Sequence, residues 1–145
     1  MQWWINGQPA HGIDLNDRGL AYGDGVFETV AIRNGEPRFF SHHLDRLAHA
    51  CERLRLVTPE PDTLTAAVSK AATGMRHGVL KILYTRGAGQ RGYALPAVPM
   101  PTLALGLEAV EPPPSGPVDV CWCETMTSVN PATAGIKTLG RLEQV

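Results

Sequence analysis

Apolar residues recur at strand spacing in four segments of the chain. Residues 26–32 are rich in β-branched side chains, and residues 79–85 form a nearly continuous apolar run of the length of a buried strand. Residues 103–107 and 118–122 have a similar character. We therefore predict strands at these four places, with residues 79–85 at the centre of a sheet.

Two Asn-Gly pairs indicate tight turns between shorter strands. Asn6-Gly7 follows the apolar residues 3–5, and Asn34-Gly35 follows the first of the four long strands. Both residues of such a pair tolerate positive φ, which a two-residue hairpin turn requires. We expect a short strand at residues 3–5 and a return strand at residues 38–40.

Two segments between the predicted strands have helical spacing. After Ser41, a residue suited to an N-cap, apolar side chains recur at steps of three and four residues. A second helix is predicted to begin at Asp62 and to close at Gly74. The positions expected to face the core are Leu44, Leu47, Cys51 and Leu54 in the first helix, and Leu64, Val68 and Ala71 in the second.

The order of these elements predicts an α+β fold, a two-layer domain with a mostly antiparallel sheet and two helices. We assign residues 1–111 to this small domain and the proline-rich residues 112–117 to a linker. Residues 118–145 would then be the beginning of a second, larger domain. Residues 140–145 start an amphipathic helical pattern that stops without a cap, so we expect the chain to be a fragment.

Composition restricts the class of partner. The 145-residue chain has a formal net charge of −1, which gives no basic field for nucleic acid. No apolar run approaches the roughly 20 residues that cross a bilayer, and residues 1–7 lack the features of a signal peptide. The three cysteines form no C-x-x-C pair, which argues against a zinc site and a disulfide framework. We expect a cytoplasmic protein with a small-molecule substrate and no metal, nucleic-acid or membrane partner.

A glycine-rich segment follows the predicted central strand. Gly87, Gly89 and Gly92 match the G-x-G-x-x-G pattern of dinucleotide-binding folds. That fold requires a helix directly after the last glycine, because the helix N-terminus binds the pyrophosphate. Pro96 and the prolines after it leave no room for such a helix. A flexible active-site loop fits this segment better.

Two basic residues have both a chemical and an ordinary explanation. Arg46 lies on the first predicted helix, where most arginines are surface residues. A packed helix also suits an arginine that binds phosphate through its planar fork. Lys137 stands among Gly, Ala and Ile residues, where partial desolvation would free its amine for Schiff-base chemistry, although most lysines beside a loop are simply solvated. The residues alone leave both questions open.

Three segments stand out together by their order and spacing along the chain. They are Asp17-Arg18-Gly19 with Tyr22-Gly23-Asp24-Gly25-Val26-Phe27-Glu28-Thr29, His43-Leu44-Asp45-Arg46-Leu47, and Ala134-Gly135-Ile136-Lys137-Thr138-Leu139-Gly140-Arg141-Leu142-Glu143-Gln144-Val145. Together they resemble the fold-type IV pyridoxal-phosphate (PLP) enzymes, which include branched-chain aminotransferases, D-amino-acid aminotransferases and aminodeoxychorismate lyases. The resemblance covers the whole chain and implies PLP as the cofactor.

The resemblance also implies roles for single residues. Lys137 would bind PLP covalently, and Arg46 would bind the cofactor phosphate. Thr29 would be a second catalytic residue that relays or donates a proton. The loop at residues 87–93 would reach the site of the neighbouring subunit, which implies a homodimer. The substrate-binding residues implied in this way are Tyr22, Phe27, Arg91 and Tyr93.

Within the family, the residues after Gly135, the loop at residues 86–93 and Thr29 resemble the lyases best. The lyases convert 4-amino-4-deoxychorismate to 4-aminobenzoate and pyruvate, a step toward folate, and freed Lys137 would be the base that removes a proton beside the substrate amine. An aminotransferase on the same scaffold is the alternative, and a non-catalytic domain that only dimerises or folds is the alternative of another class. The family's acidic partner of the pyridine nitrogen lies in a C-terminal domain beyond these 145 residues, so we expect no catalysis by this chain alone.

Overall fold

The computed structural model describes residues 1–112, 115–127 and 129–145, so residues 113 and 114 of the predicted linker lie outside the described residues. The elements in chain order are β1 (Gln2–Ile5), β2 (Gln8–Pro9), α1 (Arg18–Tyr22), β3 (Gly25–Arg33), β4 (Glu36–Pro37), α2 (Phe40–Leu54), α3 (Pro61–Ala72), β5 (His77–Thr85), β6 (Thr102–Ala109) and a 3-10 helix, η1 (Leu142–Gln144). The predicted α+β fold is confirmed, with α1 as an additional short helix.

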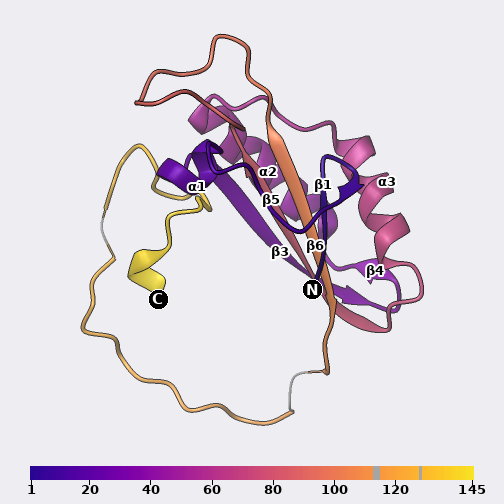
Figure 1. Ribbon diagram of the computed structural model, residues 1–145. Coiled ribbons are helices and arrows are strands. Elements are labelled where there is room, and N and C mark those ends of the chain that lie inside the picture. The colour runs from indigo at the N-terminus through magenta and orange to yellow at the C-terminus, as the bar shows by residue number, and fades with distance from the viewer. Residues whose placement is uncertain (113–114, 128) are drawn as a thin grey trace.

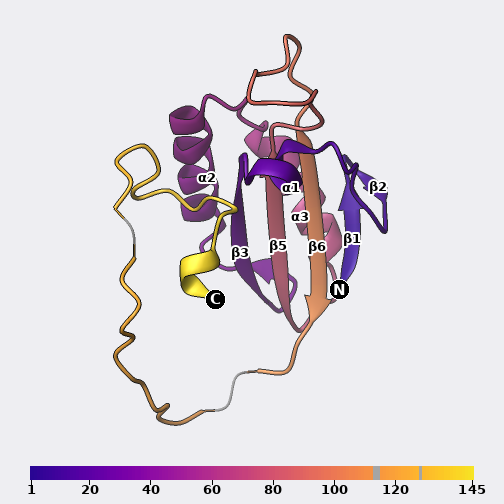
Figure 2. The same ribbon diagram turned by 60° about the vertical axis from the view of Figure 1, so that its left-hand side comes forward.

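A six-stranded sheet forms one layer, with the strand order β2-β1-β6-β5-β3-β4. All neighbouring strands pair antiparallel. Strand β5 pairs with β3 along its whole length and with β6 along most of it, so the predicted central strand is confirmed. Helices α2 and α3 cover one face of the sheet, whereas α1 and the C-terminal segment lie at the opposite face (Figures 1 and 2).

Alternation along β3 determines which side chains enter the core. Val26, Val30 and Ile32 are fully buried on the face that α2 and α3 cover. Phe27 and Thr29 point to the other face, because successive side chains of a strand alternate between its two sides. The strand therefore supplies core residues on one face and leaves the other face available for a site.

The two long helices bury the apolar faces that their spacing predicts. The buried residues are Leu47, Ala50 and Cys51 in α2, and Leu64, Val68 and Ala72 in α3. Helix α3 begins at Pro61, one residue ahead of the prediction, because the fixed φ of proline suits the first helical position.

The predicted return strand at residues 38–40 is wrong. Strand β4 is only Glu36–Pro37, and its last backbone hydrogen bond to β3 is from Arg38 N–H to the carbonyl of Ala31 (2.8 Å). Phe39 then adopts a left-handed conformation (φ 52°) and precedes the first residue of α2. Ser41 consequently lies inside the first turn of α2 and is not its N-cap.

The predicted strand at residues 118–122 is also wrong. These residues have no regular structure, and the side chains of Val118, Val120 and Trp122 are exposed. A strand forms where its backbone groups pair with those of a neighbouring strand. No described strand lies beside this segment, which leaves its apolar alternation without a partner.

The C-terminal tail (residues 129–145) returns to the sheet at the first residues of β3 (Figure 2). Val26 and Thr138 form an isolated antiparallel bridge. The amphipathic pattern at its end forms only the single turn of η1. Among the described residues, no helix has the length and apolar character needed to cross a membrane.

Candidate active site

Two backbone hydrogen bonds fix the C-terminal tail against β3. Phe27 N–H donates to the carbonyl of Lys137 (3.0 Å), and Leu139 N–H donates to the carbonyl of Gly25 (3.0 Å). Gly25 permits this approach, because a Cβ at this position would lie 2.8 Å from Cδ1 of Leu139 in the tail. The pairing brings Lys137 beside the aromatic ring of Phe27.

An open hollow of about 510 Å³ lies where β3, α2 and the tail meet. We call it the Lys137 hollow, and its lining residues are Phe27, Arg46, Gly135, Ile136, Lys137, Arg141 and Gln144. The structure thus brings together three of the residues predicted for the site, Phe27, Arg46 and Lys137, from three separate segments.

Three cations surround the ring of Phe27. Nζ of Lys137 lies 4.8 Å from the ring centroid, Cζ of Arg141 lies 5.3 Å from it, and Nζ of Lys81 lies 5.7 Å from it. A positive charge is attracted to the face of an aromatic ring at such distances. The three side chains give the hollow a positive potential that suits an anionic ligand.

Arg141 and Lys81 were not among the residues predicted for the site. The spacing of β5 contained a signal for Lys81, because the residues on either side of it, Leu80 and Ile82, are apolar and buried. Lys81 must therefore point to the uncovered face. Arg141 had no comparable local signal, since its place depends on the return of the tail.

Arg46 is held by Glu28 of β3. Its Nε donates to one carboxylate oxygen of Glu28 (2.7 Å), and its Nη2 donates to the other (2.5 Å). Nδ1 of His43 lies 2.8 Å from the same carboxylate. Among the described residues Nη1 of Arg46 has no hydrogen-bond partner, and the side chain is half-exposed at the hollow. The arrangement orients the guanidinium while leaving one nitrogen for a ligand.

Glu28 remains charged although it is buried. Burial raises the pKa of its carboxyl, but hydrogen bonds and charges from Arg46 and His43 outweigh burial and hold this pKa below its ordinary value. The hydrogen bond to Glu28 in turn raises the pKa of the Arg46 guanidinium. Glu28 was predicted only as part of a motif, and not as the partner of Arg46.

Tyr22, Arg91 and Tyr93 form a second group, away from the Lys137 hollow. The rings of Tyr22 and Tyr93 are 5.5 Å apart between centroids, and Gly92 N–H donates to the hydroxyl of Tyr22 (3.2 Å). Arg91 lines a separate hollow of about 580 Å³ between its own loop and residues 14–16. None of these three lines the Lys137 hollow.

Thr29 lies near the Lys137 hollow but does not line it. It is exposed on the same face of β3 as Phe27, one side-chain position further along, and it pairs with Lys81 in the sheet. It is not part of the Lys137 hollow. The described residues also contain no cluster of three or more His, Cys, Asp or Glu side chains that could hold a metal ion.

Residues 25–145 match the family model of class IV amino-transferases. The chain belongs to the class IV aminotransferase family. The matched range includes every residue that lines the Lys137 hollow. The resemblance to fold-type IV enzymes is therefore confirmed, and the hollow is a feature of a class IV aminotransferase family member.

Members of the family with two activities are similar to the chain. Aminodeoxychorismate lyase from Vibrio harveyi is 29% identical over 147 residues, which cover 99% of this chain and 54% of that protein. The crystal structure of 4-amino-4-deoxychorismate lyase from Pseudomonas aeruginosa has a TM-score of 0.85 and 40% identity, over 98% of this chain and 54% of that one. D-alanine aminotransferase from Listeria innocua is 35% identical over 88 residues, which cover 58% of this chain and 30% of that protein.

The chain spans about half the length of the lyases that it matches. A hypothetical aminotransferase from Mycobacterium tuberculosis, in its PLP-bound form, has the same fold with a TM-score of 0.65 at 23% identity. The lyases match 99% and 98% of the chain, so their similarity extends into residues 1–24, which lie outside the family model.

Proposed function

We propose that the chain is the N-terminal half of a PLP-dependent lyase that converts 4-amino-4-deoxychorismate to 4-aminobenzoate and pyruvate. The main support is coverage, since two lyases match 99% and 98% of the chain and the D-alanine aminotransferase matches 58%. The positive potential of the Lys137 hollow supports the same substrate, which is anionic through its carboxylates.

The residues of the Lys137 hollow fit PLP. Lys137 offers an amine for the cofactor aldehyde, and Nη1 of Arg46 offers a donor for a phosphate oxygen. Phe27 supplies an apolar surface between them. When bound, PLP withdraws electrons from the bonds at the substrate carbon that bears the amine.

The chain's own residues would then have distinct tasks. Nζ of Lys137 would accept the proton from that carbon. The exposed hydroxyl of Thr29, on the same face of β3, would relay a proton. Arg141 and Lys81 would attract substrate carboxylates to the ring of Phe27. We place this protein in the cytoplasm as a homodimer in which Tyr22, Arg91 and Tyr93 contact the substrate.

Covalent trapping tests the cofactor assignment. The 145-residue chain is mixed with PLP and reduced with borohydride, and the labelled peptide is mapped. We expect the label on Lys137 and its loss in Lys137→Ala. Lys70→Ala, at an exposed position of α3, is the matched control and should keep the label. Label scattered over Lys70 and Lys81 would contradict the assignment.

An aminotransferase is the second candidate, because D-alanine aminotransferase relatives match the chain at up to 35% identity. The products separate the two activities. A lyase releases 4-aminobenzoate together with pyruvate, whereas an aminotransferase passes the amine to a keto-acid acceptor and forms no 4-aminobenzoate, so the diagnostic products are 4-aminobenzoate and the aminated acceptor. Both products are measured with the longer chain that includes the C-terminal half. If neither product forms and PLP is not bound, a non-catalytic domain is the remaining explanation.

A further inference from the structure

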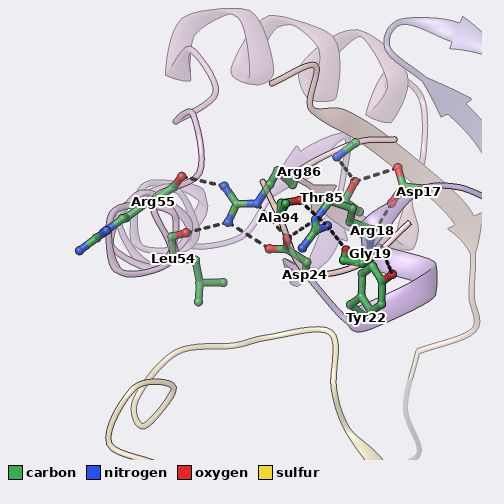
Figure 3. Close-up of polar contacts among 12 residues, drawn as sticks. Asp17, Arg18, Gly19, Tyr22, Asp24, Leu54, Arg55, Thr85, Arg86 and Ala94 are labelled. Atoms are coloured by element: carbon green, nitrogen blue, oxygen red, sulfur yellow. Dashed lines mark hydrogen bonds and ion pairs between the residues drawn. The ribbon is translucent and has the colours of Figure 1, made fainter. Parts of the chain in front are cut away.

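Arg18, the first residue of α1, is a buried cation whose donors point away from the core. It is 4% exposed. Its Nε donates to Asp24 (2.8 Å), and its Nη1 donates to the carbonyls of Gly92 and Ala94 (3.2 Å each). Figure 3 shows the guanidinium between Asp24 and Ala94. Ala94 belongs to the loop of residues 87–95, which we call the Arg91 loop. One side chain thus joins α1 to a loop that lies some seventy residues further along the chain.

Asp24 is fixed from a second side. Arg86 donates to both oxygens of Asp24, through Nε (2.8 Å) and Nη2 (3.1 Å). Arg86 also donates to the carbonyls of Leu54 and Arg55 at the end of α2. Burial raises the pKa of Asp24, but hydrogen bonds from Arg86 and Arg18 outweigh it and hold this pKa below its ordinary value. The carboxylate therefore stays charged and orients Arg18.

The Arg91 loop has few other attachments near its tip. The hydrogen bonds that join residues 90–95 to the rest of the described chain are made by Arg18 and by the hydroxyl of Tyr22. Tyr93 at the tip is 85% exposed, and its ring lies 5.5 Å from the ring of Tyr22. The base of the loop is closed separately, because Arg18 N–H donates to the carbonyl of Gly87 (2.9 Å). The conformation of the tip therefore depends on two side chains.

We propose that Arg18 is the positioning residue that holds the tip of the Arg91 loop in one conformation, with Tyr22 as its second anchor. In the lyase, Arg18 fixes Arg91 and Tyr93 where they meet an anionic substrate. This second part of the inference rests on the proposed function. Because the anchors belong to the same chain as the loop, each subunit shapes its own loop before any partner arrives.

Trypsin measures the anchoring, since cleavage of the bond between Arg91 and Gly92 becomes faster as the tip opens more often. Arg18→Lys keeps the charge beside Asp24 but cannot donate to three acceptors in the same geometry. We expect cleavage at Arg91–Gly92 to become about tenfold faster, with no change at the Arg38–Phe39 bond. Arg38→Lys, at an exposed arginine near the opposite end of the sheet, is the matched control and should leave the Arg91–Gly92 rate unchanged.

Tyr22→Phe removes a single acceptor from a partly exposed residue and is the milder second variant. Its cleavage at Arg91–Gly92 should also become faster. An unchanged rate in Arg18→Lys or in Tyr22→Phe would overturn the proposal. Equally faster cleavage at both bonds would overturn it too, because Arg18 would then support the whole fold.

Activity of the longer enzyme gives a separate readout. Arg18→Lys should raise the KM for 4-amino-4-deoxychorismate about tenfold and change kcat much less, because a misplaced loop weakens substrate binding. An equal fall in kcat with unchanged KM would overturn the proposed role in substrate binding. If no variant, including wild type, forms aminobenzoate, the proposed function fails while proteolysis still decides the anchoring.

Discussion

Glu28→Gln should lower the free energy of unfolding by about 2 kcal/mol near neutral pH. The carboxylate is 1% exposed and accepts hydrogen bonds from Arg46 and His43. A hydrogen bond to a charged group contributes roughly 1.5–3 kcal/mol, and removing one partner of a buried ion pair costs roughly 3–5 kcal/mol. The side chain of Arg46 is 46% exposed, so water replaces part of the lost contact. The expected loss therefore lies in the lower of these two ranges, roughly 1.5–3 kcal/mol.

The effect of Glu28→Gln should depend on pH in a definite direction. The folded pKa of Glu28 lies below its ordinary value of 4.5, because Arg46 and His43 outweigh burial, which acts to raise it. The unfolded chain then binds more protons at this group than the folded chain, so its contribution to stability rises with pH. That contribution is complete above pH 4.5 and is lost as the pH falls through the folded value. The variant and the wild type should therefore converge in acid.

Urea denaturation followed by circular dichroism, at about pH 7 and about pH 3.5, measures both effects. Glu36→Gln, at an exposed position of β4, is the matched control and should change stability by less than about 0.5 kcal/mol. If Glu28→Gln lost as little stability as the control near neutral pH, the prediction would be refuted. A loss of the same size at both pH values would refute it as well.

Three further outcomes follow from the structure. Burial raises the pKa of the Cys51 thiol to about 11. Iodoacetamide at mildly alkaline pH should therefore label the exposed Cys121 and Cys123 and spare Cys51, which peptide mass spectrometry measures. Gly25→Ala should destabilise the chain by about 2 kcal/mol in thermal unfolding, because its Cβ would lie 2.5 Å from a carbonyl oxygen of the next strand. Arg46→Lys should weaken binding of inorganic phosphate about tenfold in calorimetry, since a lysine cannot bind Glu28 and an anion through one planar fork; equal affinity would contradict the role of Arg46.

Local spacing was sufficient to predict most of the architecture. Alternation at residues 26–32 and the apolar run at residues 79–85 indicated β3 and β5, and the steps of three and four residues indicated α2 and α3. The prediction of a strand at residues 118–122 failed for a physical reason. Alternation of apolar residues describes the two faces of a strand, but it does not indicate whether a neighbouring strand exists. Pairing is a property of the fold, and spacing alone does not report it.

The candidate site could be predicted only in part, because it too depends on contacts between distant segments. Arg46 and Lys137 were named from their motifs, and the structure places both in one hollow. The place of Arg141 depends on the tail returning to β3, a contact between residues more than a hundred positions apart, whereas Lys81 follows from the alternation of β5. The geometry of the hollow therefore became visible only once the tail was placed.

One further relation could be deduced from the sequence by a stricter use of burial. Glu28 occupies an inward position of β3 between Val26 and Val30, and a carboxylate is costly to bury without cationic partners. The covering helix offers a cation, Arg46, and a second hydrogen-bonding partner, His43, three residues apart on one face of the helix. The orientation of Arg46 thus follows from the strand that it covers, and its side chain lines the hollow.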